Sequence, residues 1–463
     1  MTAAYDAVFR GGTLATSEGP LRADLAVADG RVAAVGLDLD AHGARLIDAS
    51  GMIVAPGAID VHTHFANRVA EGVTADDYES GSRAAAAGGI TSFINFAFQE
   101  PGQTLRAALE AELERARGRS LLDFGVHLVV TDLSVPGLLD ELPALAEEGC
   151  TSLKLFTAVG NLELSPREVL GVLDAAARNG LIVNVHAEDG PLIDHLTHRL
   201  LAEGRRSVEH LPAARPPAAE ALATATVAAY AQATACPVYF VHLSCRAALD
   251  AVREVRRRGA EIYVETRPAY LYLDASRYRL PDREGNKFVC WPPLRERDDQ
   301  AALWEGLRNG EVQTYATDHT TWLQAQKMDP ALAFDDIPGG VSNVQTSVGM
   351  LFAEGVARRR ISLARFVEVT ASNPARLFGL WPRKGTLAVG ADADVVVIDP
   401  QRRFTVAAEA MESRSDFDPY EGYEGVGWPV LTMAAGEVIA AEGGVHAGPG
   451  RGRFLVRSRP ARL

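Results

Sequence analysis

An alternation of two kinds of segment dominates the middle of the chain, from about residue 57 to 380. Short apolar runs take turns with amphipathic stretches of helical period, which is the pattern of βα units in a parallel sheet. Eight strands are predicted, at residues 58–62, 91–96, 124–130, 151–156, 181–186, 237–242, 261–265 and 312–318. Crossover helices are predicted at 107–118, 165–180 and 246–259, each ending in glycine. Eight such strands predict an α/β fold, a (β/α)8 barrel of the TIM type.

The two ends of the chain have a different residue pattern. Both consist of short alternating runs broken by glycine, as in β-hairpins. Two β-rich ends around a βα middle predict one small β-sandwich domain that is built from both termini. The expected segments are 1–56 for the first part of the sandwich, 57–380 for the barrel, and 381–463 for the second part of the sandwich and a tail.

Charge and hydropathy limit the partners. The formal net charge is −14, with 60 acidic and 46 basic residues, which repels a nucleic-acid backbone, so no nucleic-acid partner is expected. No apolar run approaches the roughly 20 residues of a membrane helix, and the N-terminus lacks a basic and then apolar signal segment. We therefore expect no membrane partner and a cytoplasmic location.

Polar residues stand where several predicted strands end. Barrels of this type carry their chemistry at the C-terminal rim, where the loops converge on one mouth. The residues concerned are His62, His64, Lys154, His186, His242 and Asp318. All but the lysine are standard ligands of a borderline cation such as zinc. One strand-end histidine alone is more often a core residue, but their joint occurrence on separate strands predicts a metal centre.

Lys154 does not fit a simple ligand set, because an ammonium group repels a cation and has only donors. One interpretation is that the amine reacts with carbon dioxide and becomes a carbamate, a long-armed carboxylate able to bridge two ions. The alternative is a buried lysine that is paired with Asp318 or Glu188.

The motifs around these residues resemble the amidohydrolase superfamily, in its hydantoinase and dihydropyrimidinase branch. The resemblance extends over nearly the whole chain, with the motifs in the same order. They are IDVHTHF (59–65), AAAAGGITS (84–92), SLKLF (152–156), VHAED (185–189), VHLSC (241–245), ETRPAYL (265–271), PPLR (292–295), ATDH (316–319) and NPARLFGLWPRKGTLAVGADADVVV (373–397).

The resemblance implies a binuclear metal-dependent hydrolase that opens a cyclic amide bond in a small hydantoin- or dihydropyrimidine-type ring, with a metal-bridging hydroxide as the nucleophile. It implies two divalent metal ions, usually zinc, and a carbamate derived from carbon dioxide on Lys154 that bridges them. His62, His64 and Asp318 would hold one ion, and His186 and His242 the other. Asp318 would also carry the proton to the leaving nitrogen. The family commonly forms homotetramers, so a homo-oligomer is expected.

The positions expected to bind substrate depart from the family pattern. Val159 stands where the family has a tyrosine whose hydroxyl helps to hold the oxyanion. Either the metals and another donor replace that hydroxyl, or the substrate differs, or a loop shift brings Thr157 into the role. Trp291, before PPLR, replaces a serine whose main chain contacts the ring. Gly339 and its neighbour Gly340 fall in a loop that contacts substrate through its backbone.

Arg267 is a further departure, since it replaces the cysteine of the family's ETCPHYL segment. It could pair with a substrate carboxylate or, as the more frequent case, belong to a structural ion pair. Allantoinase- or dihydroorotase-like activity is an alternative function that uses the same metals. A non-catalytic scaffold is a further alternative, against which the retention of all six ligand positions argues.

Overall fold

The computed structural model describes residues 5–69 and 72–463. Its centre is a sheet of eight parallel strands in the order β17-β16-β15-β14-β13-β12-β11-β8. The strands are β8 (Ala58–Asp60), β11 (Ile90–Phe98), β12 (Asp123–Val129), β13 (Ser152–Phe156), β14 (Ile182–His186), β15 (Val238–Phe240), β16 (Ile262–Thr266) and β17 (Thr314–Tyr315). The chain beyond the two edge strands closes the sheet, because Thr63 forms a parallel bridge to His319 and the His64 N–H donates to the His319 carbonyl oxygen at 3.0 Å.

These eight strands overlap the predicted ones, but β8, β15 and β17 are shorter than predicted. For β8 and β17 the reason lies in Asp60, whose carboxylate Oδ1 accepts from the backbone N–H groups of His62 at 3.2 Å and Thr317 at 3.1 Å. These donors are satisfied by a side chain instead of a strand ladder, so the regular pairing ends before the residues at the rim.

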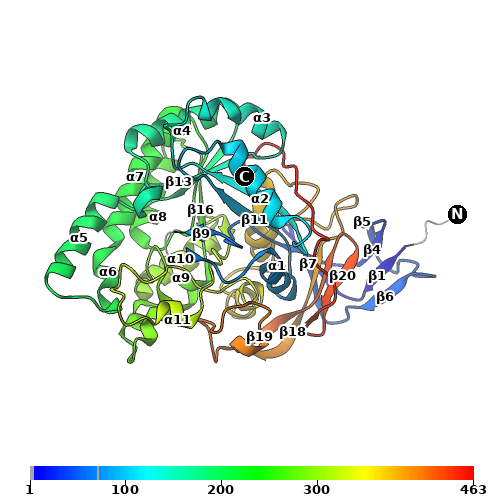
Figure 1. Cartoon of the computed structure of the whole chain (residues 1–463). Helices are drawn as coiled ribbons and strands as arrows, with labels where there is room; N and C mark the ends of the chain where they lie inside the picture. The colour runs from blue at the N-terminus through cyan, green and yellow to red at the C-terminus, as the bar shows by residue number, and fades with distance from the viewer. Residues whose placement is uncertain (1–4, 70–71) are drawn as a thin grey trace.

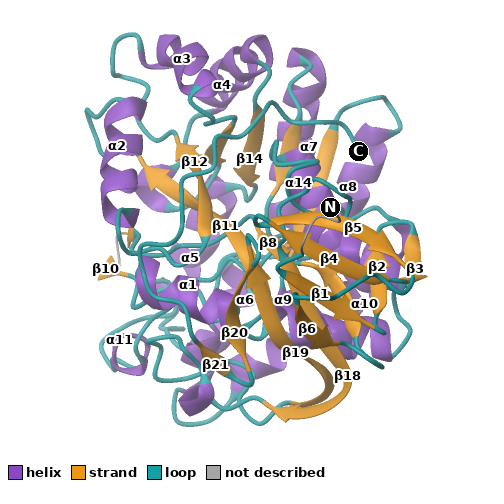
Figure 2. Cartoon of the chain, turned by 90° about the vertical axis from the view of Figure 1, so that its right-hand side faces the viewer, coloured by secondary structure: helices purple, strands orange, loops and turns teal. Residues whose placement is uncertain are grey.

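Helices cover the outside of the barrel (Figure 2). The longer ones are α1 (Tyr78–Ala87), α2 (Leu105–Ala116), α4 (Pro166–Asn179), α5 (Gly190–Ala202), α7 (Pro217–Thr234), α8 (Arg246–Arg256) and α10 (Arg297–Asn309). The shorter ones are α3 (Leu142–Glu147), α6 (Leu211–Ala214), α9 (Pro268–Tyr272), α11 (Gln324–Lys327), α12 (Ser347–Leu351), α13 (Leu363–Val367) and α14 (Asn373–Leu377). The three predicted crossover helices correspond to α2, α4 and α8. Helix α4 has the expected signals, with a capping box between Ser165 and Glu168 and a left-handed Gly180 after its last turn.

Strands from both chain ends form two further sheets beside the barrel. Figure 1 shows the blue N-terminal strands next to the orange and red C-terminal ones. The four-stranded sheet has the order β5-β4-β1-β6, and the seven-stranded sheet has the order β21-β20-β19-β18-β7-β2-β3. The strands are β1 (Ala7–Arg10), β2 (Thr13–Thr16), β3 (Gly19–Arg22), β4 (Asp24–Ala28), β5 (Arg31–Gly36), β6 (Arg45–Asp48), β7 (Ile53–Pro56), β18 (Val395–Thr405), β19 (Glu424–Ala434), β20 (Glu437–Ala441) and β21 (Gly444–Val445).

The two ends meet directly in the larger sheet, where β7 pairs antiparallel with β18. Side chains of both sheets share one apolar core, in which Phe9 and Leu25 pack with Val54, Val395 and Met433. The predicted β-sandwich built from both termini is therefore confirmed, whereas the limits 1–56, 57–380 and 381–463 stay a prediction. Separately, β9 (Arg68–Val69) pairs antiparallel with β10 (Gly72–Val73).

The C-terminal tail packs against the end of the barrel at which the strands begin. Leu455 donates its N–H to the Phe124 carbonyl oxygen at 2.7 Å and is fully buried. The buried Arg457 side chain donates to Ser152 Oγ at 2.9 Å. The barrel is thus filled from this side, which leaves the opposite rim for a ligand. Within residues 5–69 and 72–463, no helix has the length and apolar character to cross a membrane.

Candidate metal centre

One cavity of about 460 Å³ opens at the rim where the strands end. Its wall includes all six predicted ligand positions, His62, His64, Lys154, His186, His242 and Asp318. The three predicted substrate-contacting residues, Val159, Trp291 and Gly339, line the same cavity. Residues that lie up to 256 positions apart in the sequence, from His62 to Asp318, therefore face one space.

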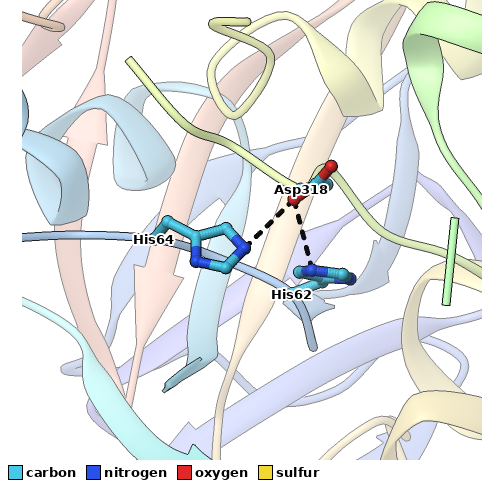
Figure 3. A group of neighbouring side chains, drawn as sticks. All are labelled: His62, His64 and Asp318. Carbon is cyan, nitrogen blue, oxygen red and sulfur yellow. Dashed lines mark ion pairs between the residues drawn. The ribbon is translucent and has the colours of Figure 1, made fainter. Parts of the chain in front are cut away.

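His62, His64 and Asp318 form a candidate metal-binding group (Figure 3). Asp318 Oδ1 lies 3.2 Å from His62 Nε2 and 3.1 Å from His64 Nε2. The two histidines follow β8 one residue apart, and both rings point toward the same oxygen, as expected for alternate residues of extended chain. Tetrahedral ligands about 2.1 Å from a zinc ion lie roughly 3.4 Å from each other, so these separations fit a shared cation.

Neighbouring side chains fix both rings of this group. His62 Nδ1 is 2.8 Å from Glu265 Oε1, and His64 Nδ1 is 3.0 Å from Asn67 Oδ1. Burial lowers the pKa of His62 and of His64, so both imidazoles are neutral at neutral pH. A neutral ring whose Nδ1 donates to an oxygen presents the lone pair of Nε2, which is the form that binds a metal.

His186 and His242 form the other half of the centre. His186 Nδ1 lies 3.1 Å from His242 Nε2, and His186 Nε2 lies 2.8 Å from Glu188 Oε2. Burial lowers the pKa of His186 to about 4 and that of His242 well below its usual range. Burial alone would raise the pKa of Glu188, but Arg215 and His186 outweigh it and hold it at about 2. Two neutral rings with nitrogen atoms this close suit one cation between them.

Lys154 is buried in the cavity wall, with its Nζ 5.5 Å from the centre of the Phe96 ring and 4.6 Å from that of Phe156. Burial lowers the pKa of its amine to about 7. The alternative pairing with Asp318 or Glu188 is not found in the part of the chain that the structure describes, since Asp318 pairs with an arginine and Glu188 with Arg215. The amine is therefore partly neutral at neutral pH. Among the described residues no carboxylate forms an ion pair with it, although the charge of Glu265 opposes the lowering of its pKa.

The donors present fit two divalent cations. Four neutral imidazoles and one carboxylate are available, in two groups whose ligand atoms are spaced as around a tetrahedral ion. The orphaned Nδ1 of His242 is buried without a hydrogen-bond partner among the described residues. A carbamate on Lys154 would add the anionic oxygens that a bridge between two cations requires.

The cavity wall is apolar at Val159 and Trp291, two positions that differ from the family pattern. Val159 has φ +88°, a left-handed conformation that is rare for a β-branched residue. The indole of Trp291 lies near Gly339, whose added Cβ would be 3.3 Å from the ring, and near Arg215, whose guanidinium is 4.8 Å from the ring centre. The Gly339 carbonyl oxygen accepts from Trp322 Nε1 at 2.8 Å.

Thr157 is not placed to replace the missing tyrosine. Its hydroxyl donates to the backbone carbonyl oxygens of His186 at 3.1 Å and Glu188 at 2.7 Å, and it accepts from the Glu188 N–H at 3.1 Å. These bonds hold the loop after β14. Thr157 is not among the described residues that line the cavity, so the interpretation that its hydroxyl takes this role is wrong for this structure.

Arg267 belongs to a structural ion pair and not to the cavity wall. It is fully buried, and its Nη1 donates to Asp318 Oδ2. Its side chain is absent from the residues that line the cavity. The interpretation that it meets a substrate carboxylate is therefore wrong for this structure.

Several residues that hold the site were not identified in the sequence as functional: Glu265, Asn67, Arg215. Glu265 accepts from His62, from the His242 N–H at 2.8 Å and from Tyr239 Oη at 2.8 Å. Its signal was a glutamate at the end of an apolar strand, EIYVE, because a carboxylate buried there needs several donors. Asn67 and Arg215 lie in loops, and nothing in their local sequence points to the site.

Comparisons with known proteins agree with this geometry. The model of the amidohydrolase family matches residues 53–439. A D-hydantoinase of Geobacillus stearothermophilus is 38% identical over 98% of this chain and 96% of its own length. A D-hydantoinase of Rhizobium radiobacter is 38% identical over 98% and 99%. The crystal structure of a dihydropyrimidinase from Brevibacillus agri NCHU1002 superposes with a TM-score of 0.96 at 38% identity, over 98% of this chain and 99% of that one.

Proposed function

The chain belongs to the amidohydrolase family, and on that premise we propose that it is a metal-dependent hydrolase that opens a cyclic amide ring of hydantoin or dihydropyrimidine type. The observation that carries the proposal is the meeting of six ligand-type side chains from five strand ends in one cavity. The names of the similar proteins, D-hydantoinase and dihydropyrimidinase, support this substrate class. A non-catalytic scaffold would have no reason to keep all six.

The proposed ligands fall into two groups joined by a bridge. His62, His64 and Asp318 would hold one ion, His186 and His242 the other, and carboxylated Lys154 would contact both. Two divalent cations, zinc by resemblance, would supply an activated water and polarise a carbonyl oxygen. Asp318 Oδ1, which faces both histidines of its group, would carry the proton to the leaving nitrogen.

The state of Lys154 favours the carbamate. Reaction with carbon dioxide requires the neutral amine, and burial lowers the pKa of this group to about 7. Lys154→Ala removes the bridge, so we expect the loss of at least one metal per chain and of most activity. Metal content of the purified variant, together with turnover, checks this. A variant that keeps both ions and full turnover would contradict the bridge.

The substrate-contacting residues are proposed to be Val159, Trp291 and Gly339. Phe98, Phe156 and Leu162 add further apolar surface to the same cavity. Such walls suit a ring that carries an apolar substituent, because burial of that substituent contributes about 25 cal/mol per Å². Thr320 also lines the cavity, but its hydroxyl donates to the Asp318 carbonyl oxygen at 3.2 Å. The oxyanion would then depend on the metals.

A ring-opening screen with metal quantification tests the function. Hydantoins, dihydropyrimidines, allantoin, dihydroorotate and cyclic imides are offered to the purified protein, with metal-free protein as the control. We expect hydrolysis of hydantoins or dihydropyrimidines that disappears with the metal. Hydrolysis of allantoin or dihydroorotate alone would favour the alternative function. Two bound ions without hydrolysis of any ring would refute the substrate class.

Assembly and location are proposed from the resemblance and the composition. We propose a homotetramer in the cytoplasm. Light scattering of the purified protein measures the assembly, and a mass other than that of four chains would contradict it.

A further inference from the structure

The guanidinium of Arg267 lies directly behind the proposed metal ligand Asp318. Arg267 follows β16 and is fully buried. Its Nη1 donates to Asp318 Oδ2, and its guanidinium lies 4.8 Å from the centre of the Tyr270 ring. Its Nε and Nη2 have no hydrogen-bond partner among the described residues. Asp318 is its only ion-pair partner in that part of the chain.

This pair divides the two oxygens of Asp318 between two tasks. Oδ2 faces Arg267, whereas Oδ1 faces His62 and His64. A charge-assisted hydrogen bond at one oxygen fixes the plane of the carboxylate as well as its distance. The other oxygen is then held toward the histidines before any ion binds.

The backbone conformation of Asp318 shows why its side chain needs this restraint. Asp318 has φ +49°, a left-handed conformation that aspartate adopts more readily than most residues but that still carries strain. It lies three residues beyond the end of β17, immediately before the isolated bridge of His319 to Thr63. A buried cation that needs a counter-charge is a strong reason for the side chain to stay in place.

We propose that Arg267 is a positioning residue that makes Asp318 a one-oxygen ligand and preorganises the group formed by His62, His64 and Asp318. The inference rests on the proposed function and adds a residue that the family pattern does not supply, because the cysteine expected here has no positive charge to pair with the Asp318 carboxylate. Preorganised ligands lose less freedom when an ion binds, so the pair is expected to slow the release of that ion.

The test compares two variants that each remove one buried guanidinium. Arg267→Met deletes the charge behind Asp318. Arg457→Met is the matched control, since Arg457 is also buried but bonds Ser152 Oγ and the Val126 carbonyl oxygen at the other end of the barrel. Metal release to a chelator, kcat and KM are measured on the full-length holoprotein, and Arg267→Lys tests rescue by a cation.

We expect Arg267→Met to release one of the two ions roughly 10- to 100-fold faster and to lower kcat more than it changes KM. Arg267→Lys should restore part of both, and Arg457→Met should leave the release rate unchanged. Unchanged release and kcat in Arg267→Met would overturn the proposal. Equal acceleration in both arginine variants would overturn it as well, because the effect would then be general destabilisation.

A stability measurement covers the case in which a variant folds poorly. Asp318→Asn leaves the Arg267 charge buried without its partner, so adding Arg267→Met to it should raise the unfolding temperature of the full chain in chelator. A double variant less stable than Asp318→Asn would contradict the pair. Wild-type protein that binds no metal would refute the proposed function itself, and the role of Arg267 toward the ion would fall with it.

Discussion

Glu265 offers the sharpest test of how the metal centre is supported, because it touches both halves without being a ligand. Its Oε1 lies 2.8 Å from His62 Nδ1 and accepts the His242 N–H at 2.8 Å, while its Oε2 accepts from Tyr239 Oη at 2.8 Å. The carboxylate is fully buried, and burial raises its pKa, but the interactions with His62 and the hydrogen bonds from the His242 N–H and Tyr239 Oη together outweigh burial and lower it. The glutamate is therefore ionised and sets the tautomer of His62.

The size of the effect follows from these bonds. In Glu265→Ala the Tyr239 hydroxyl keeps Thr314 Oγ1 at 2.6 Å, but the donors of His62 and His242 lose their acceptor. Each unsatisfied buried donor costs about 1–3 kcal/mol, so we expect a loss of about 2–6 kcal/mol in the free energy of unfolding. Loss of the group that orients a metal-binding histidine typically weakens metal binding by about 10- to 100-fold.

Glu265→Gln separates charge from packing. The amide retains one acceptor oxygen for His62 and keeps the volume, so this variant should fold while its metal affinity falls. Chelator competition on the purified protein measures the affinity, and thermal unfolding measures the stability. Tyr239→Phe is the control, because it removes one bond to Glu265 without touching a histidine and should leave metal affinity unchanged. Wild-type metal affinity in both Glu265 variants would refute the reasoning.

Two further tests address the cavity loop and acid stability. Gly340→Ala should inactivate and destabilise the protein, since Gly340 has φ +120° and the new Cβ would lie 2.4 Å from Thr320 Cβ, whereas in Gly339→Ala the new Cβ approaches the Trp291 ring at 3.3 Å and the protein should fold. Measurements of kcat, KM and the unfolding temperature check both variants. A stable and active Gly340→Ala would contradict the packing. Burial raises the pKa of Asp76, but hydrogen bonds from His319 and other groups outweigh it and hold it at about 2. The ionised carboxylate then stabilises the folded state by about 2 kcal/mol above about pH 4, and this contribution is lost as the pH falls towards 2. In Asp76→Asn the unfolding temperature should therefore depend less on pH over that range. An unchanged slope of unfolding temperature against pH would contradict the pairing of Asp76 with His319.

The barrel could be predicted from the sequence because its signals are local. Each predicted strand needed only its own apolar run, and the predicted helices α2, α4 and α8 needed only their period and their caps. The ends of β8 and β17 were harder. They are set by Asp60, which binds backbone donors of residues 62 and 317, and no pattern within either strand reports a contact over that distance.

The meeting of the six proposed ligand positions in one cavity was also predictable, since a parallel barrel brings all strand ends to one rim whatever their distance in sequence. The residues that support them were not. Glu265 stands on a strand and carried a readable signal, but Arg215 reaches Glu188 from a loop 27 residues further on. Loop residues meet the site only through the fold of the whole chain.

The residues that contact the substrate are the hardest to predict from the sequence, because their role depends on the side chains that surround them in the folded chain. Trp291 stands where the family has a serine, and the identity of the residue does not say what its indole contacts. In the structure the indole is part of the cavity wall. The Arg215 guanidinium lies 4.8 Å from the ring centre, and a Cβ added at Gly339 would lie 3.3 Å from the ring. The polar atom of this side chain is Trp291 Nε1, which is buried without a hydrogen-bond partner among the described residues. If a carbonyl oxygen of the substrate accepts a hydrogen bond from Trp291 Nε1, that bond orients the substrate ring in a chain that has Val159 in place of the family's tyrosine. Trp291→Phe keeps an aromatic wall but removes the donor. We therefore expect it to raise KM for a ring that the wild type hydrolyses.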